Sequence, residues 1–417
     1  RHQFSQLTAP HRSGAPRRSS ADKVVIAAAF PALAMLSTNR AAGRAVTVAA
    51  GTCRSLQSGV FRIEGGRSSV SGVTATVFGC TGALGRYVVN KLGRVGSAVV
   101  VPHRVHDQDS TRRLKLMGDI GMITPMPFHA RDLKSIAACV ETSDVVINLL
   151  GKQELTRNFN FFGSNVEAVG NIAKVSKEMG VPHFIHVSAV AADVNSPSEF
   201  LRRKAEGEQE VLGYYPDATI LRSNIMFAEE DRFLNLIAKW AKLFGTVPLV
   251  GSGGNKLRPV YIDDVAEAVR QVAFDEDLRG RMYELNGPNE MTLREIARWT
   301  LDTCWMPQAT VRSIAPDLTG WVPQGASPHL WGGVFADAMY RFWPQALPGA
   351  PQLIGARGDH SSFGAVDWVP NKKLPQFEDL GITPQNFYTI APEFLRHYRR
   401  GGNFVKVHND RNNSLGL

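Results

Sequence analysis

The chain has 417 residues, more than a single hydrophobic core usually holds, which predicts two domains or one domain with a large extension. Its apolar content of 44% and charged content of 20% are those of an ordinary folded protein. The net charge of +9 is concentrated in residues 1–63, and the remaining 38 basic and 37 acidic residues nearly cancel, so we expect no nucleic-acid partner.

Residues 1–63 hold nine basic residues and one acid and are rich in Arg, Ser and Ala. This composition is typical of the transit-like leader of a protein imported into an organelle, with a disordered basic tail as the alternative. The apolar run Val24–Leu36 contains Pro31 and has 13 residues, whereas a membrane span needs about 20, so no span is predicted. Four scattered cysteines favour a reducing compartment without disulfides or metal clusters.

The stretch Thr74–Val89 predicts a strand, a glycine turn and the start of a helix. Gly79 would allow the turn, Gly82 would let backbone approach a pyrophosphate, and Gly85 would let the helix pack on the strand. The phosphates would lie on the unpaired N–H groups of the helix N-terminus. A glycine-rich turn without a ligand is the alternative.

The next strand is predicted at Ser97–Val101, after Gly93 and Gly96 end the helix. Arg104 lies 19 residues after the third glycine of the turn. NAD-binding proteins place an acid there for the ribose 2′-OH, whereas an arginine accommodates a 2′-phosphate. Arg86, on the first helical turn, could reach the same phosphate. We therefore predict NADPH rather than NADH, with two solvated surface charges as the alternative.

Strands and helices continue to alternate as far as residue 221. Strands are predicted at Met122–Phe128, Asp144–Leu150, His183–Val190 and Ala218–Leu221, and helices at Asp109–Met117, Leu133–Val140 and Phe159–Met179. Continuous apolar strands between helices indicate a parallel sheet covered on both faces. The predicted fold class is α/β, a Rossmann-type doubly wound sheet, with residues 64–224 as the NADP(H)-binding domain and residues 258–274 completing it.

Chemistry is expected beyond the carboxyl ends of these strands. Ser188 lies there, at the end of the fifth strand. Ser196–Glu199 is predicted to be a capping box with Pro197 at the first helical position. Phe200 and Lys204 are four residues apart and share one face of that helix. Alternatively, Ser188 satisfies only local backbone groups, and Lys204 is a solvated helix charge.

The motifs F-G-C-T-G-A-L-G-R, N-L-L-G, V-S-A and F-L-R-R-K resemble, in this order, those of the atypical, extended short-chain dehydrogenases/reductases. In that family a Ser orients a carbonyl, a Tyr transfers the proton, and a Lys four residues later binds the nicotinamide ribose. The resemblance places these roles at Ser188, Phe200 and Lys204. Phenylalanine has no ionisable hydroxyl, and Tyr214 and Tyr215 lie roughly 20 Å along the helix, too far to replace it.

A narrower set of motifs is similar to the nucleotide-binding accessory subunits of mitochondrial complex I, the NADH:ubiquinone oxidoreductase. It comprises G-G-R-S-S-V-S-G before the first strand and residues 221–235, 258–266 and 377–382. The likeness extends from about Gly65 to Arg400. It implies tightly held NADPH with a structural role and other complex I subunits as partners. It also implies a peripheral position on the matrix side of the inner membrane, near the quinone-access region.

The resemblance also implies which residues bind the cofactor. The pyrophosphate would be lined by the turn, the adenine flanked by Asp132 and Leu133, and the nicotinamide side formed by Leu149 and Gly151. Asp132 is equally well explained as the N-cap of the next helix. The predicted cofactor-binding set is Gly79, Thr81, Gly82, Ala83, Leu84, Gly85, Arg86, Arg104, Asp132, Leu133, Leu149, Gly151, Ser188 and Lys204. No metal ligands and no catalytic residue are predicted.

Residues 225–417 are predicted to form a smaller lobe and an irregular interface extension. Helices are expected at Phe233–Phe244, Asp263–Phe274, from Thr292, and at Ile390–Tyr398, and short strands at Val247–Val250 and Pro259–Ile262. Six of the seven tryptophans and eleven of the 23 prolines follow residue 298, which indicates a segment that packs on a partner. Alternatively, these tryptophans close the core of the lobe. The basic residues from Arg396 onward would contact acidic lipid or a partner, or complement their own helix dipole.

Three hypotheses follow from the sequence. The leading one is a non-catalytic, NADPH-binding accessory subunit of complex I. The second is an NADP-dependent reductase or epimerase that receives its proton from the substrate or a water. The third is a module that senses the redox state of NADP(H) without turnover.

Overall fold

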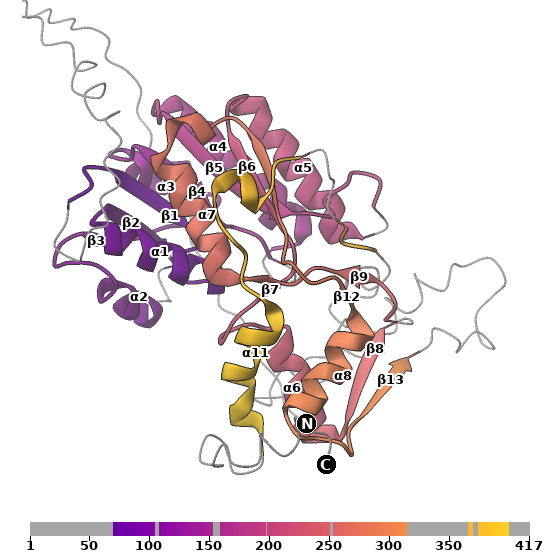
Figure 1. Cartoon of the computed structure of the whole chain (residues 1–417). Coiled ribbons are helices and arrows are strands. Elements are labelled where there is room, and N and C mark those ends of the chain that lie inside the picture. The colour runs from indigo at the N-terminus through magenta and orange to yellow at the C-terminus, as the bar shows by residue number, and fades with distance from the viewer. Residues whose placement is uncertain are drawn as a thin grey trace, which may run out of the picture. The chain divides into compact units, whose positions relative to one another are not determined.

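The computed structural model describes residues 70–104, 108–152, 159–196, 198–250, 253–314, 366–369 and 374–399 (Figure 1). The predicted leader, Trp321, Trp331 and Trp343 lie outside the described residues. The division of the chain at residues 64 and 224 stays a prediction.

Seven parallel strands form the central sheet, in the order β11-β6-β5-β4-β1-β2-β3. They are β1 Thr74–Phe78, β2 Ala98–His103, β3 Ile123–Pro127, β4 Val145–Asn148, β5 His183–Ala189, β6 Thr219–Ser223 and β11 Met282–Leu285. The order reverses between β1 and β4, which is the switch point where doubly wound sheets bind ligands. The predicted fold and its first six strands are confirmed, whereas β11 was not expected.

Helices cover both faces of the sheet (Figure 1). One face packs on α1 (Ala83–Val95), α2 (Gln108–Lys115) and α7 (Ile262–Phe274), and the other on α3 (Leu133–Val140), α4 (Ala168–Glu178) and α5 (Glu199–Tyr214). Side chains of a strand alternate between the two cores: Val77 lies in the first and Phe78 in the second. Both faces are therefore apolar, which explains the uninterrupted hydrophobic runs of the sequence.

One predicted helix end was wrong, and one predicted helix contains an unexpected irregular turn. Gly96, with φ of 79°, ends α1, but Gly93 lies inside the helix. A Cβ atom at Gly93 would lie 2.5 Å from the carbonyl oxygen of Met117, so this glycine serves close packing rather than termination. The predicted helix over residues 159–179 is not uniform, because a π-helical turn, η1 (Gly163–Glu167), precedes α4.

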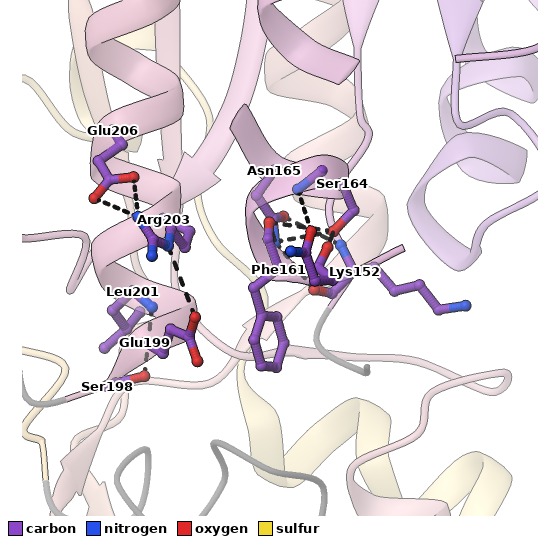
Figure 2. A network of polar contacts seen from close by, with 11 residues as sticks. Lys152, Phe161, Ser164, Asn165, Ser198, Glu199, Leu201, Arg203 and Glu206 are labelled. Carbon is purple, nitrogen blue, oxygen red and sulfur yellow. Dashed lines mark hydrogen bonds and ion pairs between the residues drawn. The ribbon is translucent and has the colours of Figure 1, made fainter. Parts of the chain in front are cut away.

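The predicted capping box at the start of α5 was also wrong. The N-cap is Ser198, whose hydroxyl accepts a hydrogen bond from Leu201 N at 3.4 Å (Figure 2). Ser196 lies outside the helix, where its hydroxyl accepts from Ser198 N at 3.3 Å. The helix therefore begins at Glu199, two residues later than a box starting at Ser196 requires.

A second core lies among α6 (Leu234–Phe244), α8 (Leu293–Thr303) and α11 (Phe387–Leu395). Short strands accompany it: β7 Met226–Phe227 with β10 Val260–Tyr261, β8 Thr246–Val250 with β13 Thr310–Ile314, and β9 Lys256–Leu257 with β12 Met291–Thr292. The 3-10 turn η5 (Arg396–Tyr398) also belongs to this core, whereas η2 (Glu276–Leu278) and η4 (Phe377–Leu380) pack on the first core beside α7. Trp299 and Trp368 pack in this core, so the core-closing alternative holds for these two. Within the described ranges, every helix is too short or too polar to cross a membrane.

Candidate functional site

The turn between β1 and α1 is built for glycine. Gly79 has a φ of 87°, a left-handed conformation that other residues rarely adopt. Gly82 is the N-cap of α1, and its N–H donates to Gly79 O at 3.0 Å. A Cβ atom at Gly85 would lie 2.3 Å from that same oxygen and 2.6 Å from the Cα of Cys80. The backbone therefore folds tightly enough to bring the N-terminus of α1 to the switch point.

The N-terminus of α1 has the properties of an anion site. Its N-cap provides no side chain to bond the first N–H groups, and its first turn contains no acid. Thr81 and Ala83 are partly exposed on either side of Gly82, and Leu84 is buried below. Unbonded N–H groups at the positive end of a helix attract phosphate. This backbone geometry fits a pyrophosphate, and the binding role of the turn stays a prediction.

The two arginines predicted near the 2′-phosphate differ in their surroundings. Arg104 is exposed just past the carboxyl end of β2, which neighbours β1 in the sheet. Arg86 forms an ion pair with Glu230, in the segment after β7, and its Nε donates to Gly82 O at 3.4 Å. Arg86 is thus not a free surface charge, and a phosphate would have to compete with Glu230 for it.

Asp132 and Leu133 begin α3 at the same edge of the sheet. The carboxylate of Asp132 accepts from Lys134 N at 3.1 Å, which confirms the helix-cap explanation for this residue. Leu133 is 41% exposed, unusual for a leucine beside a buried sheet. An apolar side chain presented to solvent here would suit an adenine ring, and that role stays a prediction.

The structure brings together the residues predicted for the nicotinamide side. Leu149 N bonds Phe78 O at 3.0 Å, which joins the ends of β4 and β1. Lys204 is 6% exposed, and its Nζ donates to Leu150 O and Val187 O at 3.2 Å each. Its explanation as a solvated helix charge is therefore wrong. A Cβ atom at Gly151 would lie 2.5 Å from this Nζ.

Ser188 lies at the end of β5, beside this lysine. It is 4% exposed, and within the described part of the chain its hydroxyl has no hydrogen-bond partner. The alternative that Ser188 only satisfies local backbone is wrong. A buried hydroxyl without a partner costs free energy unless a ligand or a water forms a hydrogen bond with it. The Ser188 hydroxyl is therefore a candidate contact for a polar group of a ligand.

Sequence reasoning missed two polar side chains under this site, Asn148 and His186. They are partners in the β4–β5 register, and both are fully buried. The Oδ1 atom of Asn148 accepts from Leu150 N at 3.1 Å, so its Nδ2 faces Nδ1 of His186 at 3.3 Å and donates to it. Burial, together with the charge of Lys204, lowers the pKa of His186 well below its ordinary value. His186 is therefore neutral and carries its proton on Nε2.

Burial also governs the charge of Lys204. It lowers the pKa of the ammonium to about 8, and Glu208 on the next turn of α5 opposes the change. Glu208 itself forms a two-pronged ion pair with Arg222 of β6, at 2.6 and 3.0 Å. Near neutral pH the predicted nicotinamide side therefore holds one buried cation beside one neutral histidine.

The tyrosine position of the resembled reductases contains a packed aromatic ring. Phe200 is 5% exposed and meets Phe161 edge-on, with ring centroids 6.5 Å apart. The hydroxyl of Tyr215 donates to Val181 O at 3.2 Å, just before β5 and at the opposite edge of the sheet. Tyr214, the last residue of α5, and Tyr215, which follows it, thus lie away from Lys204, as predicted.

A cleft of about 670 Å³ opens elsewhere, between residues 229–232 and the C-terminal helix α11. Asp231 lies in its wall, where burial raises its pKa to about 6, and its carboxylate caps α6 by accepting from Leu234 N and Asn235 N. The cleft is separate from the predicted site except through Glu230, which pairs with Arg86. The described residues contain no His, Cys, Asp and Glu cluster able to hold a metal.

Comparison with known proteins agrees with this geometry. Residues 75–285 match the NAD dependent epimerase/dehydratase family. The chain is 40% identical over 340 residues to the mitochondrial NADH dehydrogenase (ubiquinone) 1 alpha subcomplex subunit 9 of Arabidopsis thaliana, a match covering 81% of each chain. The same subunit of Mus musculus is 39% identical over 338 residues, covering 81% of this chain and 83% of that one. The chain belongs to the subunit 9 family.

Membership of the subunit 9 family confirms the resemblance found in the sequence. Among solved structures, the triphenylmethane reductase of a Citrobacter species aligns with a TM-score of 0.56 at 15% identity, covering 78% of this chain and 99% of that one. At this identity the likeness shows the fold alone. The roles of the individual site residues in this subunit 9 chain are still predictions.

Proposed function

We propose that the chain is an accessory subunit of respiratory complex I that holds NADPH tightly without reacting with it. The observation that carries the proposal is a tight glycine turn at the switch point of the sheet, together with Phe200 at the proton-donor position of the resembled reductases. The glycine turn, the uncapped α1 and the unpartnered Ser188 hydroxyl fit a bound dinucleotide. NADPH would supply hydride chemistry, but Phe200 offers no hydroxyl for the accompanying proton transfer.

The choice of NADPH over NADH rests on Arg104. Its position past β2 is where a 2′-phosphate would lie, and its side chain is exposed and available. Lys204 and Ser188 would hold the nicotinamide ribose and carboxamide side. A ligand that binds only the folded state stabilises it by mass action, so the nucleotide would act as an ordering ligand for the subunit.

The subunit 9 relatives carry names that place them in NADH dehydrogenase of mitochondria. We extend this to the matrix side of the inner membrane, near the quinone-access region, with other complex I subunits as partners. Peripheral contact with the membrane surface would use the end of α6, where Leu243 and Phe244 are 62% and 47% exposed. Lys242 on the same helix and Arg396 after α11 are exposed and basic, which suits an anionic surface.

A reductase or epimerase is the second candidate, because Ser188 and Lys204 occupy the positions that the resembled enzymes use. One experiment separates the two. The natively purified protein is denatured, the released nucleotide is identified by mass, and a parallel sample is incubated with carbonyl substrates. Stoichiometric NADP(H) that is not consumed supports our proposal. NAD(H), or steady turnover of a carbonyl substrate, contradicts it.

A further inference from the structure

We infer that Glu230, a residue between β7 and α6, sets how strongly the chain prefers NADPH over NADH. Its carboxylate pairs with Arg86, one of the two arginines predicted for the 2′-phosphate, and so opposes the binding of that phosphate. Glu230 is thus a specificity-determining residue outside the predicted cofactor-binding set. The inference rests on the proposed function, and it concerns only the extra phosphate that distinguishes NADPH from NADH.

Arg86 lies where a phosphate is expected. Its backbone N–H donates to Gly82 O at 3.2 Å, and its Nε donates to the same oxygen at 3.4 Å. The side chain therefore folds back onto the N-cap of α1 instead of extending into solvent. This brings the guanidinium to the positive end of the helix, whose first turn contains no acid.

The partners of Arg86 occupy both edges of its guanidinium. A guanidinium binds a phosphate with two parallel N–H groups, either from its Nε side or from its far end. Gly82 O takes the Nε position, and Glu230 bonds Nη1 at the far end. A two-pronged contact with a phosphate therefore requires that one of these acceptors is displaced. Whichever edge the phosphate uses, the negative charge of Glu230 opposes it.

The turn that carries Glu230 is fixed to the rest of the molecule. It joins β7 to α6 (Figure 1). The carboxylate of Asp231 caps α6 by accepting from Asn235 N at 3.0 Å, and Asn235 Nδ2 donates to Glu229 O at 2.9 Å. The hydroxyl of Tyr398 donates to Asn235 Oδ1 at 3.0 Å. Glu230 is therefore presented to Arg86 by a backbone that α6 and η5 hold in place.

The exposure of the two charges limits the size of the effect. Arg86 and Glu230 are 27% and 43% exposed, so solvent screens their attraction in part. A pair of this kind changes a binding constant by up to about fivefold. The charge of Glu230 is also felt at the next residue of α1, because burial raises the pKa of Tyr87 to about 12 and the charges of Tyr261 and Glu230 add to the change.

The test compares the affinities of the full chain for NADPH and for NADH by calorimetry. Glu230→Gln should bind NADPH about fivefold more tightly than the wild type, and NADH within about twofold of the wild type. In Arg86→Gln/Glu230→Gln this gain should disappear, because it depends on the arginine that the two anions share. Glu393→Gln is the matched control, since it removes a carboxylate of α11 that lines the same cleft. It should bind both nucleotides like the wild type.

Unchanged or weaker NADPH binding in Glu230→Gln would overturn the inference, and so would an equal gain for NADPH and NADH. A wild type that binds neither nucleotide would contradict the proposed function instead. In that case, NADPH binding that appears in Glu230→Gln would still support the inference, and its absence from this variant would overturn it.

Discussion

Replacing Lys204 by methionine should remove a pH dependence from the stability of the nucleotide-free protein. Burial lowers the pKa of this lysine from 10.5 to about 8, with Glu208 opposing the change. Between these two values the lysine is neutral in the folded chain and protonated in the unfolded chain. Unfolding therefore takes up a proton, and the free energy of unfolding rises with pH across this window.

The size of the effect follows from the same two values. A pKa difference of about 2.5 is worth roughly 3 kcal/mol, at about 1.4 kcal/mol per pKa unit. Below pH 8 both states are protonated, so the folded protein bears the whole penalty of the buried charge. Methionine bears none. The variant also loses the hydrogen bonds to Leu150 O and Val187 O, which lowers its free energy of unfolding equally at every pH. The informative quantity is therefore the slope of the free energy of unfolding against pH.

Urea denaturation of the two proteins at several pH values provides the measurement. The free energy of unfolding of the wild type, minus that of Lys204→Met, should rise by about 3 kcal/mol between about pH 7 and pH 10.5. Lys115→Met, at an exposed position of α2, controls for the loss of one positive charge. If the free energy of unfolding changes with pH in the same way in the wild type and in Lys204→Met, the conclusion that Lys204 is a buried cation is refuted.

Three further predictions concern residues of the proposed nucleotide site. Phe200→Tyr should lower the free energy of unfolding by about 1–3 kcal/mol in chemical denaturation, because a hydroxyl enters an apolar core; a more stable variant would contradict this packing. Gly85→Ala should abolish NADPH retention or lower the free energy of unfolding by more than about 3 kcal/mol, because the added Cβ atom would clash with the backbone of Gly79. In the control Gly213→Ala, the free energy of unfolding should stay within about 1 kcal/mol of the wild-type value. Arg104→Ala should weaken NADPH binding at least about tenfold in calorimetry and leave NADH binding unchanged; equal losses would refute a 2′-phosphate contact.

Local sequence signals were sufficient for much of the fold. The glycine spacing and the apolar runs determine β1, α1 and the order of alternation, because each depends on residues close together in the chain. Asp132 was recognised as a cap for the same reason. Strand β11 was missed because its four residues include Glu284, which breaks the apolar run that identifies the other strands.

The site depended on contacts that local patterns do not contain. Whether Lys204 is solvated or buried is decided by Leu150, just after β4, and Val187 of β5, which supply its two carbonyl partners from other elements of the sheet. The pairing of Asn148 with His186 requires the strand register, although Asn148, the polar last residue of β4, and His186, inside β5, were both visible in the sequence. The ion pair of Arg86 with Glu230 joins segments 144 residues apart, and no periodicity indicates it.

The central claim is that this chain holds NADPH without turnover inside complex I. The most direct test is affinity purification of the tagged chain from mitochondria under native conditions, with mass identification of the co-purifying chains and of the bound nucleotide. Our account predicts a megadalton membrane complex containing other complex I subunits and about one NADP(H) per tagged chain. A monomer or dimer that purifies without complex I subunits would contradict it.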